Sequence, residues 1–179
     1  MMSTVTQDSS VWTIKSGALT IRLNSRSLAI EMAQDGGKSW TSSTDDSQDV
    51  VLKSGATFSL ASASHIDIAE YRAGDLHGVR ASIKGFSQLD MSLALIVAAD
   101  PVLNEAIIRV IPIDDPLDAI EEIRYPRSLE LDATGDGAFH VVPCSQGALI
   151  PPDWPGEITW WWMGITYTRA VYMPWFGAI

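Results

Sequence analysis

Two residues of this 179-residue chain, His140 and Cys144, are of the types that act together as a base and a nucleophile. A histidine that takes the proton of a cysteine thiol produces a reactive thiolate. The segment that joins them, FHVVPC, contains β-branched residues and a proline, which favour an extended strand. Four residues of a strand span about 13 Å, too far for a hydrogen bond between the two side chains. We therefore interpret Cys144 as a buried, unreactive cysteine, because a catalytic pair would need a histidine from elsewhere in the fold.

Cation binding requires acidic side chains or histidines at defined spacings. The sequence DATGDG, from Asp132, begins like a calcium loop, but the twelfth position, where a bidentate glutamate is needed, is Pro143. A solvated turn explains this segment, with a looser calcium site on Asp132 and Asp136 as the alternative. The three histidines, at positions 65, 77 and 140, show no HxH or HxxxH spacing. The chain also lacks the complete glycine motifs that bind dinucleotides or phosphates. We predict neither a metal nor a cofactor.

Adjacent aspartates occur as Asp45-Asp46 and Asp114-Asp115. Glycosidases use two carboxylates that are held at a set separation across the scissile bond. Both pairs lie in polar or proline-containing turns, where aspartate is common because its side chain bonds to the nearby backbone. We interpret them as turn residues and predict no catalytic residue in this chain.

Tryptophan is concentrated near the end of the sequence, where five of the seven lie between positions 154 and 175. Trp160, Trp161 and Trp162 are consecutive, and alternate side chains of a strand point to opposite faces. Trp161 must therefore face away from its two neighbours and be either exposed or covered by another layer. An indole suits a sugar ring as well as a neighbouring domain. We predict a carbohydrate-contacting or domain-contacting role for Trp154, Trp161, Trp175 and Phe176. The alternative is that a thick core absorbs the whole cluster.

Composition restricts the partners of the chain. Lys and Arg number 12 against 22 Asp and Glu, which gives a net charge of −10. This balance argues against nucleic acid and against anionic membrane surfaces, which attract clustered basic residues. The single cysteine allows no intramolecular disulfide. The polar N-terminus, MMSTVTQDSS, has no signal-peptide pattern, so we expect a cytoplasmic location.

Alternation of apolar and polar residues is the main structural signal of the chain. The segments VWTIK from Val11, LTIRL from Leu19 and LAIEM from Leu28 each alternate as half-buried strands do. About a dozen such segments, separated by turn residues, predict an all-β, antiparallel β-sandwich of the supersandwich type, which would be incomplete here. We expect a disordered tail over residues 1–9 and a single domain over 10–179. At most one short helix is predicted, over 116–122 with Asp115 as its cap; a strand over 120–124 is the alternative.

Several short motifs carry a family resemblance: RYPR from Arg124, GALIP from Gly147 and YMPWFGA from Tyr172. In order and spacing they resemble the N-terminal, galactose-mutarotase-like β-sandwich of endo-α-N-acetylgalactosaminidase-like glycoside hydrolases. The resemblance implies that a (β/α)-barrel follows the sandwich and supplies the catalytic carboxylates. It carries no catalytic residue onto this chain, and it implies that Trp175 lies near the boundary between the sandwich and the barrel.

The abrupt apolar end of the sequence, FGAI from Phe176, leads us to expect a piece of a longer polypeptide. We expect a non-catalytic sandwich that packs on a missing catalytic barrel and helps to shape it. Its partner would be that domain or a carbohydrate. One alternative is an autonomous carbohydrate-binding module that uses exposed Trp154 and Trp161. The other is an assembly domain that forms a homo-oligomer through its aromatic C-terminal edge.

Overall fold

A computed structural model describes residues 3–35, 38–42, 48–87, 89–115, 118–127, 129–131, 140–142, 148–150 and 177–178. The chain divides into two compact units, Met1–Glu130 and Leu131–Ile179, which we describe separately. Our prediction of one domain over residues 10–179 stays a prediction.

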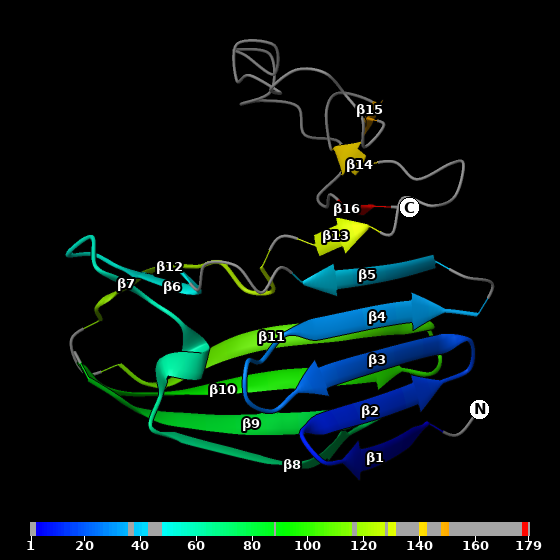
Figure 1. Ribbon diagram of the computed structural model, residues 1–179, viewed down its shortest axis with the longest axis horizontal. Coiled ribbons are helices and arrows are strands. Elements are labelled where there is room, and N and C mark those ends of the chain that lie inside the picture. The colour runs from blue at the N-terminus through cyan, green and yellow to red at the C-terminus, as the bar shows by residue number, and fades with distance from the viewer. Residues whose placement is uncertain are drawn as a thin grey trace. The chain divides into compact units, whose positions relative to one another are not determined.

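The first unit contains a β-sandwich, which confirms the predicted all-β antiparallel class (Figure 1). Its larger sheet has the order β1-β2-β3-β4-β5-β13, and β13 (Leu129–Leu131) spans the boundary between the units. The other strands of this sheet are β1 (Thr4–Asp8), β2 (Val11–Ser16), β3 (Leu19–Asn24), β4 (Ile30–Gln34) and β5 (Lys38–Ser42). Consecutive strands from β1 to β5 pair antiparallel with short turns, and the alternating segments at Val11, Leu19 and Leu28 predict β2, β3 and β4 among them.

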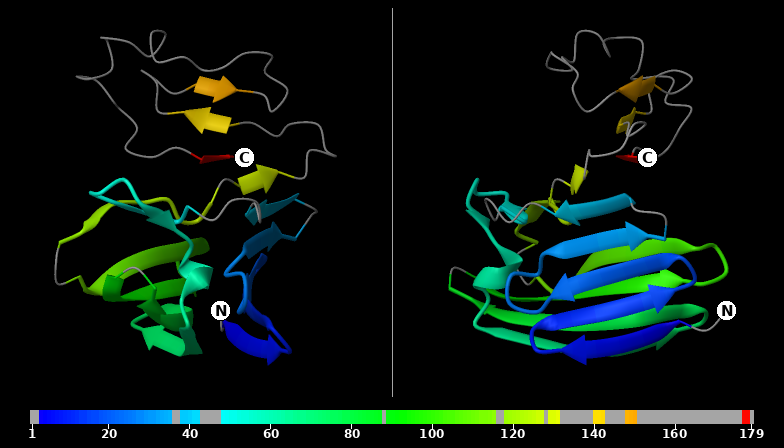
Figure 2. Two further views of the ribbon diagram at one scale, coloured as in Figure 1. Left: turned by 60° about the vertical axis from the view of Figure 1, so that its left-hand side comes forward. Right: turned by 45° about the vertical axis from the view of Figure 1, so that its right-hand side comes forward.

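The second layer of the sandwich is a four-stranded antiparallel sheet with the order β11-β10-β9-β8 (Figure 2). Its strands are β8 (His65–Ala73), β9 (Leu76–Phe86), β10 (Leu89–Asp100) and β11 (Glu105–Asp114). Strand β10 is the most buried of the four, because it lies between β9 and β11 and carries apolar residues on both faces. This agrees with the apolar run MSLALIVA in the sequence.

Two smaller sheets complete the described elements. In the first unit, β6 (Val50–Leu52) pairs with β7 (Thr57–Phe58) and with β12 (Ile120–Ile123). A short 3-10 helix, η1 (Leu60–Ser62), follows β7. In the second unit, β14 (His140–Val142) pairs with β15 (Ala148–Ile150) and with β16 (Gly177–Ala178).

The core lies between the two layers of the sandwich. The larger sheet contributes buried aliphatic side chains such as Ile14, Ile21 and Leu23, and the four-stranded sheet contributes Val79, Leu95 and others. In β3, Ile21 and Leu23 alternate with exposed or half-exposed residues, whereas Leu95 of β10 has buried neighbours on both sides. Removal of such apolar surface from water is the main force that holds the two layers together.

Two expectations from the sequence are wrong. Residues 4–8 are not a disordered tail: they form β1, which pairs with β2 over its whole length. The β-branched residues in TVT favour this strand, and Val5 packs against the core. The predicted helix over 116–122 is also absent from the described residues 118–122. Asp118 has a φ of 46°, which a helix does not accept, and the strand that we named as the alternative forms as β12.

Candidate functional site

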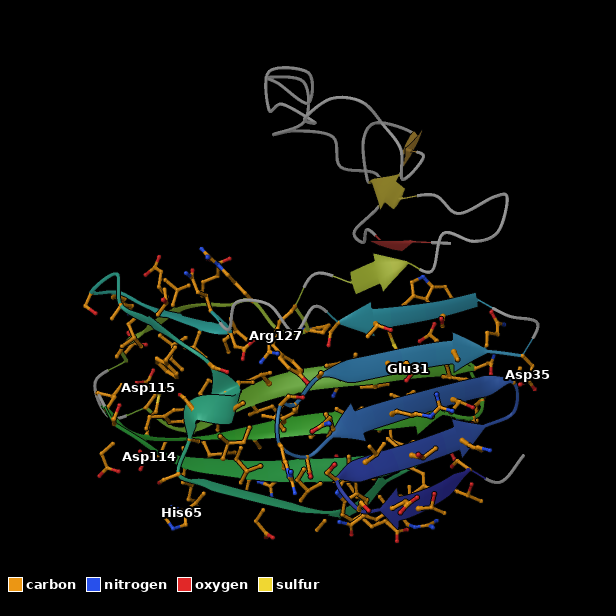
Figure 3. All side chains as sticks on the ribbon, in the orientation of Figure 1. Glu31, Asp35, His65, Asp114, Asp115 and Arg127 are labelled. Carbon is orange, nitrogen blue, oxygen red and sulfur yellow. The ribbon has the colours of Figure 1, made fainter. Side chains whose placement is uncertain are left out.

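The predicted contact residues Trp154, Trp161, Trp175 and Phe176 lie outside the described residues, so their roles stay predictions. Cys144, Asp132 and the pair Asp45-Asp46 also lie outside them. Asp114 and Asp115 lie at the periphery of the sandwich, where Asp115 accepts hydrogen bonds from the backbone of the turn before β12 (Figure 3). Asp115 is a turn residue, as we predicted, whereas Asp114 is the last residue of β11.

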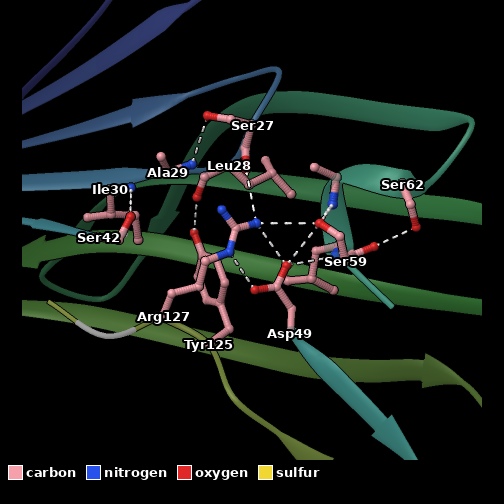
Figure 4. A network of polar contacts seen from close by, with 12 residues as sticks. Ser27, Leu28, Ala29, Ile30, Ser42, Asp49, Ser59, Ser62, Tyr125 and Arg127 are labelled. Carbon is pink, nitrogen blue, oxygen red and sulfur yellow. Dashed lines mark hydrogen bonds and ion pairs between the residues drawn. The ribbon is translucent and has the colours of Figure 1, made fainter. Parts of the chain in front are cut away.

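A buried ion pair between Asp49 and Arg127 is the best-connected polar feature of the first unit (Figure 4). Asp49 comes directly before β6, and Arg127 follows β12. The Nε atom of Arg127 donates to Oδ1 of Asp49 at 2.7 Å, and its Nη2 atom donates to Oδ2 at 2.9 Å. The side chains are only 7% and 0% exposed, so this bidentate pair is shielded from water. The bond to Asp49 raises the pKa of Arg127.

Every oxygen of Asp49 has a partner. Oδ2 also accepts from the Ser59 hydroxyl at 3.2 Å and from the backbone N–H of Leu60 at 2.8 Å. The backbone carbonyl of Asp49 accepts from the N–H of Arg124 at 2.8 Å. A carboxylate that is saturated with donors and buried beside a guanidinium does not serve as a general base. These contacts are those of a cluster that holds the fold together.

The segment after β12 also binds the loop between β3 and β4. Arg127 donates from Nη2 to the carbonyl of Ser27 at 3.2 Å, and the Tyr125 hydroxyl donates to the carbonyl of Leu28 at 2.6 Å. Leu28 is fully buried and has a φ of 56°, a conformation that costs a leucine about 1 to 2 kcal/mol. Burial raises the pKa of Tyr125 far above its ordinary value, with the negative charge of Asp49 as a second cause. Tyr125 thus remains a neutral donor.

The patterns in the sequence did not lead us to predict that Asp49 is buried. One signal was available: Asp49 directly precedes the apolar run VVL, and the RYPR motif of the resemblance contains Tyr125 and Arg127. The pairing itself joins residues 78 positions apart, which local patterns do not encode. No buried side-chain nitrogen or oxygen in the described part of the chain lacks a hydrogen-bond partner.

A second polar cluster contains Ser3, His77 and Glu70. The imidazole ring of His77 lies between the serine and the carboxylate. His77 is 4% exposed, its Nε2 lies 2.8 Å from Oε1 of Glu70, and its Nδ1 lies 3.0 Å from the Ser3 hydroxyl. The same Nδ1 lies 2.9 Å from the Ser3 carbonyl oxygen, which can only accept a hydrogen bond. A histidine that acts as the base for a serine needs an unprotonated nitrogen facing the hydroxyl, which here would be Nδ1. The carbonyl opposes that state, so the cluster does not form a nucleophilic triad.

The described residues contain no group of three or more histidine, cysteine, aspartate or glutamate side chains arranged to hold a metal ion. The helices among them include none with the length and apolar character needed to cross a membrane.

Comparisons with known proteins show what the fold is similar to. No family model and no curated protein matches the chain. Among solved structures, the chain is similar to the α-N-acetylgalactosaminidase NagBb from Bifidobacterium bifidum. For a quadruple mutant of NagBb, the TM-score is 0.77 with 20% identity, covering 93% of this chain and 27% of that one. For its complex with GalNAc, the TM-score is 0.70 with 19% identity, covering 82% and 23%.

This chain therefore spans about a quarter of the length of the solved structures that it matches. At this level of identity, the similarity concerns the fold.

Proposed function

We propose that this chain is a β-sandwich domain of a carbohydrate-active enzyme that hydrolyses glycosides. The observation that carries the proposal is the structural similarity, over 93% of the chain, to a portion of an α-N-acetylgalactosaminidase. The sequence motifs RYPR, GALIP and YMPWFGA support it, because they resemble the sandwich of a related class of enzymes that act on N-acetylgalactosaminides.

Within such an enzyme, we infer that the domain is non-catalytic and packs on a catalytic barrel. The described polar clusters support this role, because their acidic groups have other partners. Asp49 is saturated by Arg127, Ser59 and the backbone, and Glu70 is held by His77 and Arg72. In the parent enzyme, the barrel would supply the two carboxylates that hydrolysis of a glycoside needs.

A comparison of two polypeptides tests this proposal. The 179-residue chain and the product of its complete reading frame are each incubated with p-nitrophenyl α-N-acetylgalactosaminide and with a panel of other aryl glycosides. We expect nitrophenol release from the longer polypeptide and none above the blank from the 179-residue chain. Turnover by the 179-residue chain alone would contradict the non-catalytic role. A complete reading frame without any glycosidase activity would contradict the enzyme class.

A further inference from the structure

The start of β1 is attached to the β8–β9 hairpin by the N-terminal clamp, which we define as Ser3, Glu70 and His77. Strand β1 is the edge of the larger sheet, and its backbone pairs with β2 alone. Four of its five residues are exposed, and only Val5 packs against the core. An edge strand with so little buried surface opens easily. We therefore expect the clamp to contribute, together with the pairing to β2, to the stability of β1 in the sheet.

Both ring nitrogens of His77 face acceptor oxygens. Nε2 faces a carboxylate oxygen of Glu70 at 2.8 Å, and Nδ1 faces the carbonyl oxygen of Ser3 at 2.9 Å. Only the protonated imidazolium donates from both nitrogens at once. Either neutral form leaves a lone pair against one of the two oxygens. The Ser3 hydroxyl, 3.0 Å from Nδ1, can then donate to the ring, but the carbonyl contact is lost.

We propose that the N-terminal clamp is a pH-dependent fastening of β1. Protonated His77 holds Ser3 and Glu70 together, and loss of the ring proton loosens β1 while the rest of the sandwich stays folded. Histidine suits this role because it is the side chain that changes charge between about pH 5 and 8. The loosening of β1 exposes the edge of β2, and an exposed edge is a template for pairing with another strand.

The charged groups around His77 come from three neighbouring strands. On β8, Glu70 contacts the ring directly, and its pKa is lowered first by the bond from His77 and then by the bond from Arg72. Arg72 opposes a cationic ring, but its guanidinium is occupied by the same carboxylate at 3.0 Å. On β10, Ala99 is the residue that pairs with His77. The next residue, Asp100, accepts a hydrogen bond from the backbone N–H of Val102 in the turn after β10. On β2, the exposed Lys15 pairs with Thr4, beside Ser3.

Hydrogen exchange of the intact 179-residue chain between pH 5.5 and 8 tests the clamp. After correction for intrinsic exchange rates, we expect protection of the peptide over residues 3–10 to fall at least fivefold relative to β3 as the pH rises. The variant His77→Gln is expected to remove this pH dependence. The matched control His65→Gln, which changes the other histidine of the same hairpin, is expected to keep it.

Two outcomes would overturn the proposal. One is protection of residues 3–10 that follows β3 at every pH, and the other is the same loss of pH dependence in His65→Gln. If His77→Gln fails to fold, Glu70→Gln provides the second test. It removes the carboxylate that stabilises the imidazolium, so loosening of β1 should begin at a lower pH than in the unmodified chain. An unchanged midpoint in Glu70→Gln would also overturn the clamp.

Discussion

At the scale of single residues, Arg127 determines how the end of the first unit is held. Its guanidinium contacts Asp49 before β6, the Ser59 hydroxyl before η1 and the Ser27 carbonyl after β3. These three segments are distant in the sequence, and one planar group with five donors joins them. A lysine has a single charged centre and would not reproduce this geometry. The cluster thus depends on the identity of one side chain and on its buried partner.

Removal of the negative charge at Asp49 is expected to destabilise the first unit strongly. The variant Asp49→Asn leaves Arg127 buried without a counter-ion, and the loss of one partner of a buried pair costs about 3 to 5 kcal/mol of the free energy of unfolding. Urea denaturation followed by circular dichroism measures this change. The control Glu31→Gln disrupts the exposed pair with Arg22, and we expect no measurable change. Equal effects in the two variants would contradict our view of the buried pair.

At the scale of elements, the alternating sequence pattern located strands of the larger sheet. The strands β2, β3 and β4 lie where the segments at Val11, Leu19 and Leu28 predict them, and β10 coincides with the apolar run MSLALIVA. The pattern did not predict β1 or β6. For the segment of β12 it left two alternatives open, a helix and a strand. It also missed the buried state of Asp49, because the partner that permits burial is far away in the sequence. Local periodicity reports which face a strand buries, but it does not report long-range polar pairs.

Strand β9 approaches β10 so closely at Gly78 that a larger residue does not fit. A Cβ atom at this position would lie 2.1 Å from the carbonyl oxygen of Val97 and 2.4 Å from the Cα atom of Ala98. We expect Gly78→Ala to lower the free energy of unfolding by about 1 to 3 kcal/mol, because the backbone of β10 must shift. Thermal unfolding measures the loss. Ser82→Ala, four residues later on the same strand, is the control and should unfold near the temperature of the unmodified chain.

The hairpin of β8 and β9 also predicts how stability depends on pH in acid. The folded chain lowers the pKa of Glu70 below its ordinary value of 4.5, first through His77 and then through Arg72. The stabilising contribution of the ionised carboxylate is therefore complete above pH 4.5 and is lost as the pH falls through the lowered pKa. In Glu70→Gln, the decline of the urea midpoint below pH 4.5 should be shallower. A decline identical to that of the unmodified chain would contradict the prediction.

At the scale of the whole molecule, the sandwich and its core belong to the first unit. The buried aliphatic residues of the core lie between Ile14 and Ala99 in the sequence. Both residues of the Asp49–Arg127 ion pair also lie before the end of the unit at Glu130. The first unit thus has a hydrophobic core and a buried ion pair of its own.

A fragment of residues 1–130 is therefore expected to fold alone. Its circular dichroism should show β-structure, and it should unfold in one cooperative transition. The matched fragment of residues 1–123 keeps β12 but lacks Tyr125 and Arg127, so Asp49 loses its counter-ion and Leu28 loses its hydroxyl donor. We expect this shorter fragment to be far less stable. The absence of a cooperative transition in the longer fragment would show that residues after 130 are needed for folding.

The contacts of Tyr125 and Arg127 also have a mechanical consequence. Tyr125 and Arg127 grip neighbouring carbonyl groups, those of Leu28 and Ser27, a few residues before the chain leaves this unit at Glu130. A pull on the polypeptide beyond Glu130 would thus be borne by β13 and then by the Tyr125 hydroxyl and the Arg127 guanidinium before it reached β12. The hydrogen bonds of Tyr125 and Arg127 would therefore resist a force applied to the chain after them. These contacts would protect the short β6–β12 pairing from such a pull.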